Sequence, residues 1–338
     1  MDLTQVKAEL GAFFRKDERA VMAVVYGKDV ELNAFAKSVT RVKGRYPALH
    51  GAVGHVVQGF AASWNEIGSV VFRVNELVAY HQKVNFPIIP HEVEGSWLAL
   101  MVEEGKTLKD MPISQFIWKN LLVPKVLDDV NDLSGNGVYN AGALATYGNS
   151  MNGIKKILID GVANTNNPMI RIPLTALTAS NIVDQVTIFE KKIPSSLKKH
   201  IKTIFMSETN AENYRLDYED TFGANTNYVE GKGMKSRLGA RKIVGLSCLN
   251  GSDVIFATIE GNLLKLIDLN DAPTVTDVQT LDYKVKIFME WWLGYGFYVN
   301  QLVLVSNYAD AVYGLGDDDL NTLYYPLDAA AMNATNTP

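Results

Sequence analysis

Cysteine is almost absent from this sequence: Cys248 is the one thiol in 338 residues, so the chain can form no internal disulfide. Its five histidines are scattered, whereas a structural zinc site needs clustered thiols or imidazoles. No apolar run approaches the roughly 18 residues of a membrane span. The start, Met1 to Gln5, lacks the basic and apolar segments of a secretion signal. The sequence therefore predicts a protein that is stabilised by packing, stays in the cytoplasm and has no membrane partner.

Charge of one sign is also scarce. The chain has 32 Lys and Arg against 37 Asp and Glu, a net charge of −5. This near balance argues against a dedicated nucleic-acid binder, which presents a strongly basic surface. The composition is 47% hydrophobic and 20% charged, which is typical of a folded protein of one or two domains.

Motifs that carry chemistry are missing as well. His91 and Glu92 begin like a zinc-protease motif, but Gly95 stands where the second histidine would be. The acidic run Asp317–Asp319 lacks the ligand spacing of a calcium loop, so a solvated turn is favoured. Cys248 lies in an apolar segment, where a buried, inert thiol is expected. We therefore expect no catalytic residue, no cofactor and no metal.

The N-terminal part, residues 3–45, has a helical and amphipathic pattern. Leu10, Phe13 and Phe14 recur at i, i+3 and i+4, and residues 32–39 repeat the spacing. The segment holds more Lys and Arg than Asp and Glu. Amphipathic helices without a partner stretch of their own are expected to pack against something else.

Between residues 69 and 104 the pattern changes to that of strands. Val70, Phe72 and Val74 alternate with other residues, and a second run from Ser96 to Val102 has the same character. Proline residues between the runs predict one long antiparallel hairpin with an irregular distal part. A two-stranded ribbon is marginal alone, so we expect it to rest on another subunit or another domain. The expected contact residues between subunits are Val70, Phe72, Val74, Phe86, Leu98 and Leu100, with Phe13 and Phe14 of the N-terminal part.

The rest of the chain alternates helices and strands. Asp110 is expected to cap a helix over 111–132 that Pro124 bends, and a second helix begins at Ser180 or Asn181 and ends before Pro194. The further predicted elements are a strand over 201–206, a helix over 209–221 capped by Thr209, a strand over 242–249, a hairpin turn at Asn250-Gly251 leading to a strand over 253–258, one long strand over 275–292 ended by Gly294 and Gly296, a strand over 299–305, and an acidic tail from Ala309.

This order of elements resembles that of the major capsid proteins of tailed bacteriophages, the HK-ninety-seven type. The closest local likeness runs from Ile193 to Asn307 and includes Thr203-Ile204-Phe205-Met206-Ser207, Ile243-Val244-Gly245-Leu246, Ile255-Phe256-Ala257-Thr258, Tyr283-Lys284-Val285-Lys286-Ile287 and Leu302-Val303-Leu304-Val305.

The resemblance implies an α+β capsid fold divided as follows: N-terminal arm 1–48, connection 49–68, extended hairpin loop 69–104, peripheral domain with spine helix 105–142, axial domain 143–272, long peripheral strand 273–294, and final axial strand with acidic tail 295–338.

It also implies a structural role: a subunit that assembles with itself into hexamers and pentamers of an icosahedral or prolate head around double-stranded DNA. The implied location is the virion, with the host cytoplasm during assembly, and the implied partners are a portal protein and a scaffolding or decoration protein. Six basic residues are expected to face the interior or a neighbour: Arg15, Lys16, Arg19, Arg41, Lys43 and Arg45. The alternatives are an encapsulin-like compartment shell and an α/β enzyme with an unrecognised site.

Overall fold

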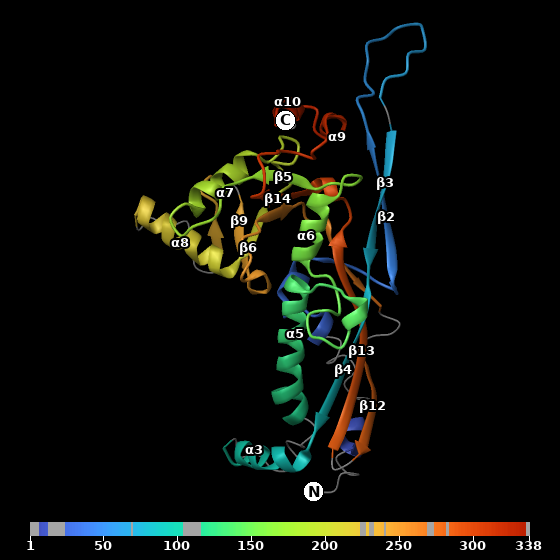
Figure 1. Ribbon diagram of the computed structural model, residues 1–338, viewed down its shortest axis with the longest axis vertical. Helices are drawn as coiled ribbons and strands as arrows, with labels where there is room; N and C mark the ends of the chain where they lie inside the picture. The colour runs from blue at the N-terminus through green and yellow to red at the C-terminus, as the bar shows by residue number, and fades with distance from the viewer. Residues whose placement is uncertain are drawn as a thin grey trace.

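The computed structural model describes residues 7–12, 24–68, 70–103, 116–223, 228–229, 233–239, 241–268, 274–281 and 284–335. Figure 1 shows an elongated molecule, with a two-stranded hairpin projecting at one end and helix α3 (Pro90–Glu103) lying at the other. Two sheets and their helices form the body between them.

The first sheet has five strands and is built around β13 (Lys284–Phe297), the longest strand described. Its other members are β1 (Lys37–Val39), β4 (Tyr80–Ile88), β11 (Leu263–Ile267) and β12 (Thr274–Leu281). Alternate residues Val285, Ile287 and Met289 of β13 are buried, as the period of a strand requires, in one core with Val126 and Val130 of helix α5 (Val123–Asn136).

Helical structure runs from Phe116 through α5 to Asn136, and this part of the long helix expected over 111–132 is confirmed. Residues 111–115 lie outside the described residues. A π-helical stretch, Ile117–Leu122, leads into it. Pro124 stands in the first turn of α5 and has no N–H to donate to the preceding turn. The backbone irregularity therefore lies in the turn directly before the proline, and the bend that the sequence predicts at Pro124 stays a prediction.

The second sheet has seven strands with a core on each face. Its order is β5 (Ile170–Pro173), β14 (Val303–Asn307), β10 (Phe256–Thr258), β6 (Thr203–Ser207), β9 (Lys242–Leu246), β8 (Gly233–Lys235) and β7 (Tyr228–Val229). Phe205 faces the core shared with α5, whereas Ile204 and Met206 face a second core that contains helix α7 (Ile182–Lys191).

Helices α7 and α8 (Glu208–Phe222) cover this second sheet. Helix α7 begins after Asn181 and ends before Pro194, as predicted. The cap of α8 is Ser207, whose side chain accepts a hydrogen bond from the Asn210 backbone N–H, so the predicted cap at Thr209 is wrong by two residues. Beside α7, the buried side chains of Arg241 and Glu190 form an ion pair of 2.6 Å between Nη1 and Oε1.

Short elements complete the chain. They are η1 (Glu31–Ala34), η3 (Ala141–Ala143), α6 (Ile154–Ala163), η4 (Ser247–Leu249), η5 (Asn300–Leu302), α9 (Asp318–Tyr324) and α10 (Ala329–Asn333).

The projecting hairpin is not the one predicted. Its strands are β2 (Arg45–Val53) and β3 (Val70–Val78), paired antiparallel from Arg45 opposite Val78 to Val53 opposite Val70. The predicted second arm, Ser96 to Val102, lies inside α3. Short apolar runs satisfy both periods, and here Trp97 and Met101 are buried on one helical face at i and i+4. The antiparallel hairpin predicted over residues 69–104 is therefore wrong.

Three other sequence predictions are also corrected. Residues 32–39 form η1 and the short strand β1 instead of a helix, because β1 adds in parallel to β11. Asn250-Gly251 does not close a hairpin, because β6 lies between β9 and β10. The predicted strand over 275–292 is two antiparallel strands, β12 and β13.

Strand β13 also continues through the two glycines that were expected to end it. A Cβ on Gly294 would lie 2.1 Å from the Val78 carbonyl oxygen, and one on Gly296 would lie 2.5 Å from Leu77 Cδ2. These glycines therefore serve a close crossing between β13 and the base of the hairpin rather than a turn.

Two helical glycines provide a matched pair for testing the packing of α5. A Cβ on Gly135 would lie 1.9 Å from the Cys248 carbonyl oxygen, whereas one on Gly95 of α3 meets nothing within 4 Å. We expect Gly135→Ala to destabilise the protein by about 1–3 kcal/mol through overpacking. Gly95→Ala should stabilise by about 0.5–1 kcal/mol, because alanine has the higher helix propensity. Urea unfolding measures the change in the free energy of unfolding for both variants. Equal changes would contradict the close contact at Gly135.

Candidate assembly surface

The hairpin carries one continuous apolar face. The register places Leu49 opposite Val74, Gly51 opposite Phe72 and Val53 opposite Val70. Residues directly opposite each other point to the same side of an antiparallel pair. The four aliphatic side chains of this set are each more than half exposed, and Phe72 is 71% exposed. No described part of the chain covers this face.

The connection between the two strands, residues 54–68, is called the tip below. Phe60 is 99% exposed and Trp64 is 92% exposed. The Gln58 side chain donates to the Asn65 backbone carbonyl over 2.7 Å and so closes the loop on itself. Exposed apolar surface of this extent on a projecting element is typical of a surface that binds another protein.

The structure brings together three of the predicted contact residues: Val70, Phe72 and Val74 lie along the exposed face of β3. Phe86 is half-buried on β4, and Leu98 and Leu100 lie on α3, with Leu100 packed against the main core. Phe13 and Phe14 lie outside the described residues.

Sequence reasoning missed the other half of the face, on β2. Leu49 and Val53 alternate, but Pro47 and Gly51 in the same run obscured the strand pattern. The feature that could have identified β2 is the pair of apolar runs that flank a glycine-containing connection.

Of the six predicted basic residues, the structure describes Arg41, Lys43 and Arg45, which are close in the sequence and differ in their surroundings. Arg41 is exposed and has a positive φ of 63°. Lys43 Nζ lies 3.4 Å from Asp268 Oδ2, and Arg45 Nη1 lies 2.7 Å from Glu76 Oε1. Arg15, Lys16 and Arg19 lie outside the described residues.

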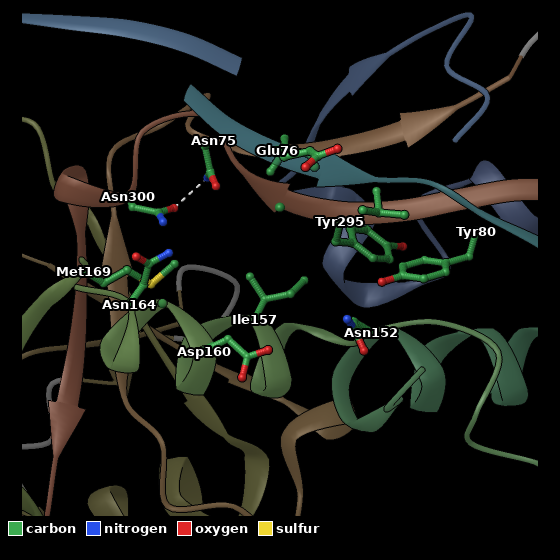
Figure 2. Close-up of a pocket in the computed structure, with 14 residues that line it drawn as sticks. Asn75, Glu76, Tyr80, Asn152, Ile157, Asp160, Asn164, Met169, Tyr295 and Asn300 are labelled. Carbon is green, nitrogen blue, oxygen red and sulfur yellow. Dashed lines mark hydrogen bonds between the residues drawn. The ribbon is translucent and has the colours of Figure 1, made fainter. Parts of the chain in front are cut away.

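Amide side chains anchor the base of the hairpin to the body. The Asn75 amide donates to the Phe297 carbonyl and to Asn300 Oδ1, both over 2.7 Å. Figure 2 shows Asn75 and Asn300 facing each other beside a cavity of about 160 Å³, with Asp160 of α6 on the opposite side. The Asn300 amide in turn donates to the Asn167 carbonyl over 2.9 Å. The direction of the hairpin is therefore set by directional bonds as well as by packing.

His50 of β2 belongs to the same anchor. Its Nε2 lies 3.0 Å from Gln301 Oε1, and the Gln301 amide donates to Asn167 Oδ1 over 2.6 Å. Burial lowers the pKa of His50, with the charge of Arg73 acting in the same direction. Nδ1 is buried without a hydrogen-bond partner in the described structure, so a proton added there would have no acceptor.

Cys248 and Asp317, which the sequence analysis weighed for catalysis or metal binding, have structural roles. Burial raises the pKa of the Cys248 thiol to about 12, with Glu31 a second cause. Asp317 accepts a hydrogen bond from the Leu320 N–H over 2.9 Å and caps α9. Among the described residues, no group of three or more His, Cys, Asp or Glu could hold a metal ion, and no helix has the length and apolarity to cross a membrane.

Comparison with family models and with curated protein sequences finds no match. Solved structures do match. The satellite phage P4 procapsid that includes the size determination (Sid) protein aligns with a TM-score of 0.52 at 10% identity, over 90% of this chain and 98% of that one. The capsid of a native GTA particle gives 0.52 at 10% identity over 83% and 97%, and that of an empty GTA particle gives 0.51 at 12% over 82% and 96%.

These alignments span most of both chains at very low identity, so they show the fold. The chain has the α+β fold of tailed-phage capsid subunits, as the order of elements in the sequence predicted.

Because the pKa of His50 is lowered in the folded protein, the stability of the anchor depends on pH. A histidine whose folded-state pKa is lowered stabilises the fold less as pH falls below its unfolded value of about 6.5, because the unfolded chain then binds more protons. We expect the urea midpoint to fall between pH 7 and pH 5, and His50→Gln to flatten that fall. The matched control is His55→Gln in the exposed tip, which should leave the slope unchanged; equal slopes for all three proteins would contradict the assignment.

Proposed function

We propose that this chain is a major capsid subunit that assembles with itself into the hexamers and pentamers of an icosahedral or prolate phage head. The observation that carries the proposal is the apolar face of the β2–β3 hairpin. The subunit leaves this face uncovered, and its fold is that of capsid proteins. In this role the protein is structural rather than enzymatic and is located in the virion, after assembly in the host cytoplasm.

The energetics favour assembly as the purpose of this face. Burying one aromatic or aliphatic side chain stabilises by about 1.5–3 kcal/mol. Several such contributions are available from exposed side chains that the described subunit leaves uncovered. These side chains are Phe72, Phe60, Trp64, Leu49, Val53, Val70 and Val74. This exposed face therefore contributes to association and little to the folding of one subunit.

The corrected hairpin changes the proposed division of the chain. The extended loop corresponds to residues 45–78, and the N-terminal arm ends before it. The five-stranded sheet with α5 corresponds to the peripheral domain and the seven-stranded sheet to the axial domain. The encapsulin and enzyme alternatives gain no support from any observation on the described residues.

Packaged double-stranded DNA, a portal protein and a scaffolding or decoration protein remain proposed partners. Among Arg41, Lys43 and Arg45, Arg41 is best placed for contact with DNA or a neighbour, because it is exposed and the described structure gives it no ion pair, while Lys43 and Arg45 pair with carboxylates. The satellite phage procapsid contains a size determination protein, which supports an accessory protein as a partner class for shells of this fold.

Electron microscopy of the purified protein tests assembly, and one substitution tests the face. We expect Phe72→Asp to change the free energy of unfolding by no more than about 0.5 kcal/mol, because the side chain is exposed, yet to prevent shells from forming.

Two controls separate folding from assembly. Leu77→Asp on the same strand and Leu100→Asp on α3 place a charge against the subunit's own core, so both should lower the melting temperature. Normal shells from Phe72→Asp, or wild-type protein that stays monomeric under all salt and concentration conditions, would contradict the proposed function.

A further inference from the structure

A cleft lies between strand β4, helix α5 and the loop of residues 144–150. Its volume is about 390 Å³, within the range of sites that bind small molecules. Much of its wall is apolar, with contributions from Val84, Phe86, Val126 and Leu144. The β2–β3 hairpin contributes no residue to this wall, so the cleft is separate from the proposed assembly surface.

Three polar groups line the cleft without a partner. Gln82 Nε2, Trp291 Nε1 and Ser150 Oγ are buried, and none has a hydrogen-bond partner in the described part of the chain. Gln82 on β4 and Trp291 on β13 stand opposite each other in the sheet register, so their side chains share one face. Both residues are more than nine-tenths buried, at 5% and 3% exposure. A buried donor without an acceptor is costly, so the cleft favours an occupant that supplies acceptors.

The number of donors indicates which acceptor group fits. The amide of Gln82, the indole N–H of Trp291 and the hydroxyl of Ser150 can each donate. One carbonyl oxygen has two lone pairs, whereas a carboxylate has two oxygens and about four acceptor positions. A carboxylate can therefore accept from all three groups, while a ketone, an ester or an alcohol cannot accept from all of them through a single oxygen.

The charges of the lining agree with an anion. The charged residues among the described lining are Lys83, Lys125 and Asp129. Lys125 Nζ lies 2.6 Å from Asp129 Oδ1, so these two charges offset each other. The positive charge of Lys83 is then in excess, and a single negative charge on an occupant would balance it. Burying an unbalanced charge is costly, so an occupant with one carboxylate fits better than one with two.

We infer that this cleft binds a monocarboxylic acid with an apolar body. The carboxylate accepts hydrogen bonds from Gln82, Trp291 and Ser150, and the body packs against the apolar wall of β4 and α5. The site is formed by one subunit, so the inference goes beyond the proposed function and does not depend on it.

Calorimetric titration of the full-length protein tests the head group. The probes are octanoate, which has a straight aliphatic body, and 3-phenylpropanoate, which has an aromatic one. The controls are the matching alcohols, 1-octanol and 3-phenylpropan-1-ol. We expect at least one acid to saturate at one molecule per chain and to bind at least about ten-fold more tightly than its alcohol, because the alcohol offers a single oxygen. The tighter acid identifies the kind of body.

Two results of this titration would overturn the inference. If neither acid shows saturable binding, ordered water alone satisfies the three donors. If an acid and its alcohol bind equally, the cleft recognises only an apolar body and the three donors take no part.

A substitution at Gln82 tests whether its amide is a ligand donor. Gln82→Met keeps the approximate length of the side chain and removes the donor. We expect octanoate or 3-phenylpropanoate, whichever binds more tightly to the wild type, to bind about 10- to 100-fold more weakly, which corresponds to one hydrogen bond to a charged group. The melting temperature without acid should stay equal or rise, because a buried donor without an acceptor is removed.

Gln58→Met in the exposed tip is the matched control and should bind the acid as the wild type does. Wild-type affinity in Gln82→Met, or a large fall in its melting temperature, would overturn the role of the amide, since a fall would mean that the amide has a structural partner.

Ser150→Ala provides a second test that does not depend on the sheet. It should weaken binding of the same acid about ten-fold or more, whereas Ser63→Ala in the tip should not. Equal affinities for the two serine variants would overturn the role of Ser150. The same preparations imaged by electron microscopy keep the two proposals apart. Shells that bind neither acid overturn this inference and leave the capsid role standing, and saturable binding by a protein that forms no shells does the reverse.

Discussion

The close crossing between β13 and the base of the hairpin determines the shape of this subunit. Gly294 and Gly296 lack the side chains that would collide with Val78 and Leu77, so the hairpin can leave the five-stranded sheet at this point. The same strand pairs with β4 along one edge and with β12 and β11 along the other. A single strand, β13, thus holds the sheet together and sets the direction of the hairpin. A residue larger than glycine at the crossing would disturb the sheet and that direction.

A second junction joins the two sheets, and it is polar. The carboxylate of Glu31 accepts from the Ser247 N–H over 2.7 Å, while Asn131 of α5 donates to Ser247 Oγ over 3.0 Å. Gly135 brings α5 against the Cys248 carbonyl. Directional bonds from η1 and from α5 therefore meet at η4, which fixes the orientation of α5 relative to the seven-stranded sheet. Apolar packing alone would not specify that orientation so closely.

The sequence was informative where one local signal dominates. Helices α5 and α7 have long amphipathic patterns that end at glycine or before proline, and the structure confirms both. The run over 96–102 satisfied two periods at once, so tertiary packing of Trp97 and Met101 decided between them. Strand β2 was hidden by Pro47 and Gly51, and the partner of β3 therefore could not be identified. The pairing of Gln82 with Trp291 joins residues that are far apart in the sequence, and no single-sequence pattern reports such a pairing.

The hairpin also has two outer edges. Within the described residues β2 and β3 pair with each other alone, so backbone N–H and C=O groups along both edges point outward. Pro47 has no N–H to donate and the Leu49 carbonyl accepts a hydrogen bond from the Tyr298 hydroxyl, but other backbone groups of β2 and β3 can pair with another strand. In the proposed role, association through side chains on the flat face closes into a particle of fixed size, whereas strand addition at an edge has no natural end. Concentrated free subunits of such a protein would then face two competing outcomes, a finite shell and an open-ended fibre.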